Sequence, residues 1–449
     1  MAKVDLEIVD VQAVDIRFPT SLTLTGSDAV HTDPDYSVAY AIIKTNDSKL
    51  AGHGFTFTIG RGTEIVVQTI YALSYMIKGK KLNEITSDFG SFWRSLTNES
   101  QMRWIGPEKG VIHLATAALV NAIWDLWAKV ENKPVWKLLV DMEPEQLINT
   151  IDFRYLSEVL TKDEALEILR SNRSSRLERE KLVLEKGVPA YTTAVGWLGY
   201  SDEKIVKLCK EAVEAGWTSF KMKVGVNLDL DIKRAKLIRD AIGYDKNLMM
   251  DANQVWDIQT AIDWMRPLAQ FKPLWIEEPT SPDDVLGHLE ISQAMKELGI
   301  GVATGEHCQN RVLFKQFLKS GAMQFCQVDA CRMGGLNEVL SVLFMAAKLK
   351  IPVCPHAGGV GLCELVQHIA IFNFVCVAPS FDNVLVEYAD SQSVNFVNPV
   401  KMSNGRYLAP LAPGYSAEMK TDSIANYLYP DGPVWQQLIQ EGKHTRRYL

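Results

Sequence analysis

The second half of the chain repeats one pattern, in which a short apolar run is followed by a longer amphipathic segment. The runs have the length and residue content of strands, and the segments between them have helical spacing. The eight runs are 191–197, 219–224, 248–251, 274–277, 301–306, 325–329, 352–356 and 384–387. Such units join parallel strands through crossover helices, and eight of them predict a closed barrel. An open nucleotide-binding sheet usually carries a glycine-rich phosphate turn, but neither GxGxxG nor GxxxxGK occurs here.

The first part of the chain has a different order, with strands first and helices afterwards. Alternating apolar residues predict strands at 5–18, 37–44 and 53–59. Helical spacing then appears in 62–78 and 83–98, and a helix that is apolar on most sides runs from 110 to about 130. We therefore expect an α+β domain with a buried central helix.

These patterns divide the chain into three segments: an α+β domain at 1–145, a barrel at 146–395, and a C-terminal return to the first domain at 396–449. Residues 20–36 form a long polar loop, and loops of this length are often functional. Residues 157–187 mix charges of both signs, which predicts solvated helices and not a nucleic-acid surface. We assign no function to this insertion.

Composition and charge exclude several classes of function. The 449 residues carry a formal net charge of -7, which argues against nucleic acid as the main partner. The seven cysteines include no CxxC pair, as expected for reduced thiols in a cytosolic-type compartment. The first residues lack a signal or transit pattern, and no apolar run approaches the length of a membrane span. We expect a cytoplasmic protein without a membrane partner; a mitochondrial location stays open.

Polar residues end the barrel strands, and in this fold the active site is built at the carboxyl ends of the strands. These residues are Lys223, Asp251, Glu277, Glu306, Asp329, His356 and Glu387. Asp251, Glu277 and Glu306 end three consecutive strands, and three crowded carboxylates repel one another unless a cation neutralises them. Their hard oxygen ligands favour Mg²⁺, with Mn²⁺ as a possible substitute. The neighbouring Glu278 should face elsewhere because strand side chains alternate.

The same strand ends supply candidates for proton transfer. Lys221 and Lys223 share one face of a strand, and we expect their proximity to lower the pKa of Lys223 enough for it to act as a base. Asp329 precedes His356 by one strand, and a carboxylate that orients an imidazole is a common acid/base unit. Mg²⁺, Lys221 and a protonated Glu387 would stabilise the anion formed when a proton is removed next to a carboxylate.

Short motifs with a fixed order connect the chain to a known family. They are Lys221-Met222-Lys223, Asp251-Ala252-Asn253, Ile276-Glu277-Glu278-Pro279, Gly305-Glu306, Asp329 with Gly334-Gly335, His356 and Glu387. Together they resemble the enolase superfamily, in its mandelate-racemase-like branch. The resemblance covers nearly the whole chain and implies a modified (β/α)7β TIM-type barrel with an N-terminal α+β capping domain.

Within this branch, several longer stretches look most similar to L-fuconate dehydratases: 17–21, 31–36, 103–109, 275–284 and 354–362. This likeness implies a Mg²⁺-dependent enzyme that converts L-fuconate, a small sugar acid, to its 2-keto-3-deoxy product. Lys223 would take the C2 proton, and His356, oriented by Asp329, would assist loss of the 3-hydroxyl group. The likeness also implies that substrate contacts come from the polar loop and from the barrel: Gly26, Ser27, Asp28, Tyr36, Lys221, Asn253 and Glu387.

Other functions stay open at this point. Another acid-sugar dehydratase, or a racemase or epimerase of the same superfamily, would use the same lysine and the same His–Asp pair. A non-catalytic structural protein on this fold would show eroded strand-end residues, whereas the set here is intact. A homo-oligomer is possible.

Overall fold

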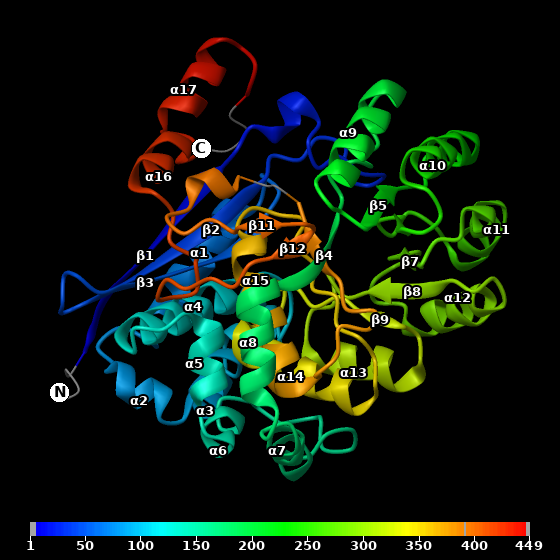
Figure 1. Cartoon of the computed structure of the whole chain (residues 1–449). Coiled ribbons are helices and arrows are strands. Elements are labelled where there is room, and N and C mark those ends of the chain that lie inside the picture. Colours follow the sequence, from blue (N-terminus) through cyan, green and yellow to red (C-terminus); the bar gives the residue numbers. More distant parts are fainter. Residues whose placement is uncertain (1–5, 390–391, 446–449) are drawn as a thin grey trace.

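A three-stranded sheet and the helices that follow it make the first part of the fold (Figure 1). The computed structural model describes residues 6–389 and 392–445. Strands β1 (Ile8–Arg17), β2 (Ser37–Thr45) and β3 (Ala51–Thr58) pair antiparallel in that order. The helices are α1 (Thr63–Ser74), α2 (Leu82–Thr86), α3 (Phe89–Thr97), α4 (Gly110–Val130), α5 (Val135–Asp141) and α6 (Pro144–Ile148). The single helix expected at 83–98 is wrong, because Asp88 caps a second helix through the backbone N–H of Ser91.

Helix α4 is the core of this region and packs directly on β3. A Cβ atom on Gly54 would lie 2.3 Å from the carbonyl oxygen of Ala118, so only glycine permits this approach. The helix has 21 residues and a mean hydropathy of 1.4 in its most apolar stretch, enough by length and composition to cross a membrane. That stretch is 89% buried inside the fold, as is usual for a core helix.

The parallel barrel follows. Its strands are β4 (Val188–Thr192), β5 (Ser219–Lys223), β6 (Asn247–Asp251), β7 (Trp275–Glu277), β8 (Gly301–Thr304), β9 (Phe325–Cys326) and β10 (Val386–Tyr388). Strands β4 to β9 pair in sequence order, and β10 pairs with β4. Residues 353–356 fill the remaining gap through bridges to β9 and to Asp329, and Pro355 accepts a hydrogen bond from the backbone N–H of Glu387. The barrel is therefore closed.

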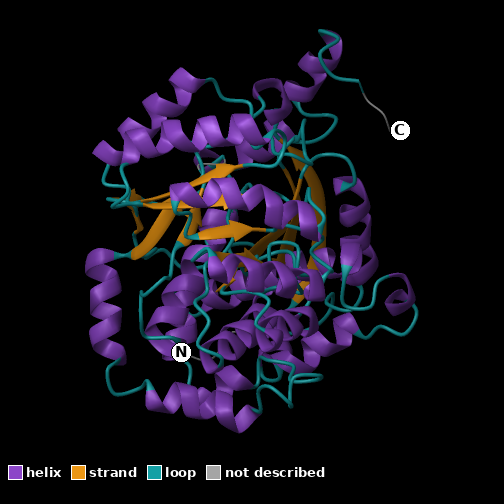
Figure 2. Cartoon of the chain, turned by 90° about the vertical axis from the view of Figure 1, so that its right-hand side faces the viewer, coloured by secondary structure: helices purple, strands orange, loops and turns teal. Residues whose placement is uncertain are grey.

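Helices surround these strands (Figure 2). They are α9 (Asp202–Glu214), α10 (Leu228–Ile242), α11 (Ile258–Leu268), α12 (Val285–Glu297), α13 (Arg311–Ser320), α14 (Leu336–Lys348) and α15 (Leu362–Phe372). The fold predicted from the sequence, a (β/α)7β barrel with an N-terminal α+β capping domain, is confirmed. The first barrel strand was expected at 191–197 but ends at Thr192, and Trp197 instead lies in the loop that follows it.

The inserted segment 157–187 forms the two expected helices, α7 (Lys162–Ser171) and α8 (Arg176–Lys186). They supply hydrogen-bond donors to the wide turn that follows α15, at 373–377. Arg179 donates to the carbonyl oxygen of Val375, and the Asn172 amide donates to those of Cys376 and Val377. Helix ends leave such carbonyl groups without partners, so the insertion stabilises this end of α15.

The C-terminal segment returns to the first domain, where α16 (Thr421–Tyr427) and α17 (Pro433–Gln440) lie beside β1 (Figure 1). The indole N–H of Trp435 donates to the carbonyl oxygen of Arg17 over 2.9 Å. The hairpin of β11 (Met402–Ser403) and β12 (Arg406–Tyr407) extends β4. The segment boundaries at 145 and 395 stay predictions. The leading residues 1–5, part of the stretch that argues against a targeting segment, lie outside the described residues.

Candidate active site

Three carboxylates from neighbouring strands meet at the carboxyl end of the barrel. Asp251 and Glu277 are the last residues of β6 and β7 and are paired in register. Glu306 follows β8, after Gly305, whose φ of +144° suits glycine. One oxygen atom from each carboxylate lies within 4.8 Å of the other two, and all three residues are buried. We call Asp251, Glu277 and Glu306 the carboxylate ring.

The chemistry of this ring fits a hard divalent cation. Burial and the charge of Asp251 raise the pKa of Glu277 well above its usual range. Burial also raises the pKa of Glu306. Carboxylates that are this costly to ionise together are stabilised by a cation, and an all-oxygen set suits Mg²⁺. The residues present therefore fit the ion that the sequence predicts.

Lys221 and Lys223 point to the same side of β5, but their surroundings differ. The Lys221 ammonium lies 2.6 Å from Glu277, 2.8 Å from Glu387 and 3.2 Å from Asp251. The Lys223 ammonium lies 2.5 Å from Asp251 and borders a cavity. Lys221 is thus enclosed by carboxylates, whereas Lys223 faces open space.

The expectation that the pKa of Lys223 is lowered is wrong in this structure. Burial and the charge of Lys221 do lower it, as the sequence suggests, but the charge of Asp251, supported by Asp28 and Glu306, outweighs both. The pKa of Lys223 therefore lies above its ordinary value. The sequence showed the neighbouring lysine but not how closely a carboxylate approaches.

His356 and Asp329 form the expected pair. Imidazole Nδ1 lies 2.7 Å from the Asp329 carboxylate, and Nε2 lies 3.6 Å from Glu306 and 3.7 Å from Glu387. Burial alone would lower the pKa of His356, but Glu306, Asp329 and Glu387 raise it to about 10. The idea of a protonated Glu387 is wrong here: burial favours that form, but Lys221 and His356 lower its pKa. Glu387 also accepts a hydrogen bond from the backbone N–H of Ala357.

A cavity of about 370 Å³ lies between the barrel and the capping domain. Its barrel wall is polar and is lined by Lys223, Asn253, Glu306, Asp329, His356 and Glu387. The buried amide oxygen of Asn253 has no hydrogen-bond partner among the residues that the structure describes, so it is an open acceptor beside the cavity. The capping wall is mixed: the polar residues Asp28, His31, Thr58 and Arg61 lie beside the apolar residues Phe57, Ile59, Val66, Val111 and Leu114. The barrel wall thus suits a charged, hydroxylated group, and part of the capping wall suits an apolar one.

The structure places three of the four predicted loop residues in the cavity wall: Gly26, Asp28 and Tyr36. A Cβ atom on Gly26, which has a φ of +84°, would lie 2.3 Å from the Tyr36 hydroxyl. Ser27 does not line the cavity, because its hydroxyl donates to the carbonyl oxygen of Leu24. Lys221, Asp251 and Glu277 lie behind the lining residues.

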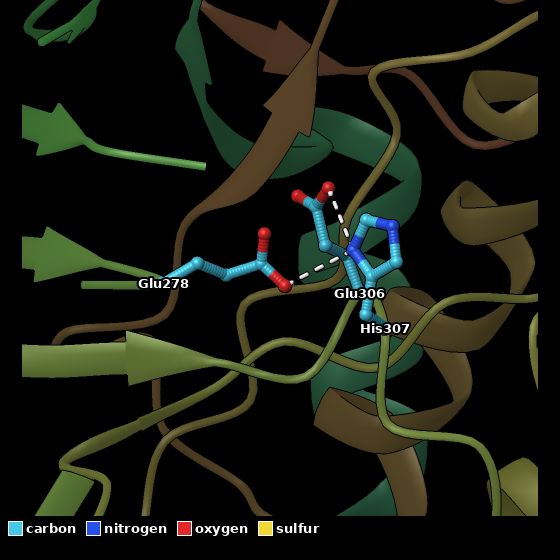
Figure 3. Close-up of side chains that lie close together, drawn as sticks. All are labelled: Glu278, Glu306 and His307. Atoms are coloured by element: carbon cyan, nitrogen blue, oxygen red, sulfur yellow. Dashed lines mark hydrogen bonds and ion pairs between the residues drawn. The ribbon is translucent and has the colours of Figure 1, made fainter. Parts of the chain in front are cut away.

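Sequence reasoning missed seven polar or aromatic residues of the cavity wall: His31, Phe57, Thr58, Arg61, Trp197, His307 and Arg332. The ring of Trp197 lies 5.3 Å from the Lys223 ammonium. His307 directly follows Glu306, and Figure 3 shows the carboxylates of Glu278 and Glu306 directed at one nitrogen of its ring. Its position next to a strand-end carboxylate was the one signal that could have found it.

Two family domains match the chain. Residues 10–140 match "Mandelate racemase / muconate lactonizing enzyme, N-terminal domain", and residues 204–423 match "Enolase C-terminal domain-like". The chain belongs to the enolase superfamily. The match to the second domain contains all three members of the carboxylate ring, both lysines and His356. The superfamily assignment made from the sequence is confirmed.

Relatives in this superfamily match almost end to end. "Mitochondrial enolase superfamily member 1" of Homo sapiens is 57% identical over 426 residues, which is 95% of this chain and 96% of that protein. "L-galactonate dehydratase" of Hypocrea jecorina is 50% identical over 429 residues, or 95% of each chain. The crystal structure of the human protein has a TM-score of 0.96 and covers 96% of this chain and 98% of its own.

A more distant structure shows only how widely the fold is shared. L-talarate/galactarate dehydratase from Salmonella typhimurium, liganded with Mg and L-lyxarohydroxamate, is 23% identical with a TM-score of 0.72. It covers 94% of this chain and 92% of its own.

Proposed function

We propose that this protein is a Mg²⁺-dependent sugar-acid dehydratase that converts L-fuconate to 2-keto-3-deoxy-L-fuconate. The observation that carries the proposal is that Lys223 and His356 face one cavity, which Glu306 of the carboxylate ring also lines. Removal of a proton next to a carboxylate needs a base, a cation for the developing charge, and an acid for the leaving group. The cavity brings candidates for all three roles together.

The proposed metal ligands are Asp251, Glu277 and Glu306. A bound Mg²⁺ would neutralise the carboxylates that raise the pKa of Lys223 and would stabilise negative charge on the substrate carboxylate. Lys221, held by Glu277 and Glu387, adds fixed positive charge beside the ring. Asn253 offers its open amide oxygen to a substrate hydroxyl group.

The reaction moves one proton off carbon and expels one hydroxyl group. The amine of Lys223 takes the C2 proton, and the C–H electron pair is delocalised into the substrate carboxylate. This anion then forms the double bond to C3 as the C3–O bond breaks, and His356 gives its proton to the departing hydroxyl, so water leaves. The enol that remains takes a proton at C3 and releases the proton of its C2 hydroxyl, which gives the 2-keto acid. Asp329 orients His356 throughout, because it holds Nδ1 at 2.7 Å.

The substrate assignment rests on a relative and on the capping wall. L-fuconate is L-galactonate without the hydroxyl group at C6, and a relative with 50% identity is named for L-galactonate. The apolar side chains of the capping wall would bury a terminal methyl group, and each buried CH₂-sized group contributes about 0.8 kcal/mol. L-galactonate is the second candidate, because that relative is named for it.

Location and assembly are part of the proposal. The relatives named "Mitochondrial enolase superfamily member 1" support a mitochondrial protein over the cytoplasmic one expected from the sequence. The homo-oligomer, and the absence of nucleic-acid and membrane partners, stay predictions.

A panel of sugar acids tests the function. The Mg²⁺-loaded protein is incubated with L-fuconate, L-galactonate, their C2 epimers and galactarate, and keto-acid release is measured as the semicarbazone. We expect the highest kcat/KM for L-fuconate, with L-galactonate next. Proton exchange or epimerisation at C2 without keto acid would contradict dehydration and indicate a racemase or epimerase. Keto acid from galactarate alone would contradict the assignment of a monoacid.

A further inference from the structure

Beside the carboxylate ring lies a second set of side chains, which follow the same three strands. Gln254, Glu278 and His307 follow Asp251, Glu277 and Glu306 along the chain and contact one another. The Gln254 amide nitrogen lies 3.0 and 2.9 Å from the Glu278 carboxylate oxygens and 2.7 Å from His307 Nδ1. The same His307 nitrogen lies 3.1 Å from Glu278 and 3.5 Å from Glu306 (Figure 3).

Two residues of this set have a left-handed backbone conformation. Gln254 and Glu278 have φ values of +68° and +40°, a left-handed conformation that costs a side-chain-bearing residue about 1–2 kcal/mol. The backbone N–H of Gln254 donates to the carbonyl oxygen of Glu278 over 2.8 Å, which ties the two strained residues together. Strain of this kind persists where the surroundings enforce it and gathers at functional sites.

His307 also contacts the capping loop. Its ring lies parallel to that of His31, with an angle of 4° between the planes and 6.4 Å between the centroids. His31 Nδ1 lies 3.0 Å from Asp28, which also accepts hydrogen bonds from the backbone N–H groups of Val30 and His31. Asp28 lines the cavity, so one chain of contacts runs from the loop through His31 and His307 to Glu306.

We propose that His307 is a positioning residue that couples closure of the capping loop, residues 20–36, to metal binding by the carboxylate ring. The inference rests on the Mg²⁺ site of the proposed function. Glu306 belongs to the ring, and its Oε1 lies 3.5 Å from His307 Nδ1 while its Oε2 lies 3.6 Å from His356 Nε2. His307 therefore restricts where one side of this carboxylate points. The ring of His307 also lies parallel to the ring of His31, which belongs to the capping loop.

The spacing of Glu278, Glu306 and His307 would also admit a second cation, but their contacts favour the positioning role. One atom each of these side chains lies within 4.8 Å of the others. The Gln254 amide nitrogen already fills a hydrogen-bonding position on each Glu278 carboxylate oxygen. The contacts therefore describe a closed set of side chains, and its link to the loop is the ring stack.

Coupling of this kind has a measurable consequence. If closing the loop favours the metal-bound arrangement of Glu306, then Mg²⁺ must favour the closed loop by the same factor, because binding free energies are reciprocal. Coupling energies in proteins correspond to factors of about 5–150. Mg²⁺ alone, without any sugar acid, should therefore slow amide exchange in residues 20–36 by about fivefold or more.

Three full-length variants separate the contact of His307 with the carboxylates from its contact with the ring of His31. His307→Ala removes both contacts. His307→Asn keeps a polar group near the position of Nδ1, facing Glu278, but removes the ring. His31→Asn keeps the hydrogen bond to Asp28 but removes the other ring of the stack. Mg²⁺ affinity is measured by calorimetry, and loop exchange is measured by hydrogen–deuterium exchange with and without Mg²⁺.

We expect His307→Ala to weaken Mg²⁺ binding by about 10–100-fold, as loss of a group that orients a metal ligand does. His307→Asn should restore most of this affinity. In both asparagine variants, Mg²⁺ should no longer slow exchange in the loop. Unchanged coupling in His31→Asn and His307→Asn would overturn the inference while leaving the metal site in place. A wild-type chain that binds no Mg²⁺ would overturn the metal site and the coupling together.

Discussion

At the residue scale, the two lysines of β5 show how one strand can supply a fixed charge and a reactive group. Lys221 contacts three carboxylates, and its side chain is 1% exposed. Release of any of these partners would leave a buried charge uncompensated, which is strongly destabilising. Among the described residues, Lys223 has one carboxylate partner, Asp251, and it borders the cavity. Of the two, Lys223 is therefore the one that can exchange its carboxylate contact for a substrate proton.

We predict that Lys223→Ala and His356→Asn fail at different steps of the proposed reaction. Loss of the base should slow exchange of the substrate's C2 hydrogen with solvent by about 10²–10⁴-fold. Loss of the acid should reduce keto-acid release by a similar factor but leave C2 exchange measurable. Both rates are followed by NMR in deuterated buffer.

Binding of Mg²⁺ is the control for these variants, because neither substitution removes a member of the carboxylate ring. Lys233→Ala, which removes an exposed lysine paired with Asp202, controls for loss of a lysine as such. Unchanged C2 exchange in Lys223→Ala would remove Lys223 from its role as the base. Loss of C2 exchange in His356→Asn would contradict the division of roles.

At this scale, the properties of a residue could be predicted from the sequence where its partners are close to it along the chain. Lys221 and Lys223 had to share a face, because alternation along a strand is local geometry. The pKa of Lys223 was not predictable, because the distance to Asp251 depends on two strands that pair 28 residues apart. Ser27 was assigned to the substrate from a resemblance, but its hydroxyl contacts Leu24 in its own loop.

At the element scale, strands were easier to predict than the turns that follow them. A polar residue at the end of an apolar run marks a strand end, and this placed Asp251, Glu277 and Glu306 together. The left-handed conformations of Asn253, Gln254 and Glu278 leave no such pattern, because nothing in these side chains requires a positive φ. The second set of side chains beside the ring therefore escaped notice, and with it the contact between His307 and His31.

The loop at 20–36 has its own requirement, which lies at Gly26. We predict that Gly26→Ala will reduce kcat/KM by roughly 10²-fold, the loss that misplacement by about 1 Å can cause. The added Cβ would lie 2.3 Å from the Tyr36 hydroxyl, so Tyr36 must leave its place in the cavity wall. The kinetic constants of the variant with the preferred sugar acid provide the measurement.

Gly299→Ala is the matched control for this substitution. Gly299 has a similar φ, +72° against +84°, but among the described residues no atom beyond its two chain neighbours lies within 4 Å of its added Cβ. Both variants should lose about 1–2 kcal/mol of unfolding free energy through backbone strain. The Gly299 variant should keep its kcat/KM. Equal kinetic losses in both variants would mean that strain, and not Tyr36, explains the effect.

At the scale of the whole molecule, the cavity exists because three distant segments are held together. The capping domain supplies one wall and the barrel supplies the other, and the C-terminal segment binds both. His368 on α15 lies where all three meet. Its Nδ1 accepts from the backbone N–H of Trp136 on α5, and its Nε2 lies 3.1 Å from the hydroxyl of Ser416. The ring also packs edge-on against Tyr415.

This junction should make the fold sensitive to acid. Burial lowers the pKa of His368 from its ordinary 6.5 to about 3, because the charged ring loses its hydration and no carboxylate among the described residues offsets that loss. Between these two values the unfolded chain binds one more proton than the folded one. The stability contributed by the neutral ring is therefore complete above pH 6.5 and is lost as the pH falls toward 3, by at most about 1.4 kcal/mol per pH unit.

We predict that His368→Asn will flatten this dependence. Asparagine offers an oxygen atom to the Trp136 N–H but does not titrate, so the variant should lose less unfolding free energy than wild type between pH 7 and pH 5. Urea unfolding at the two pH values measures the difference, and subtracting the two proteins cancels the other buried histidines. Identical pH slopes would contradict the prediction, because His368 would then not be a neutral, buried tie between the three segments.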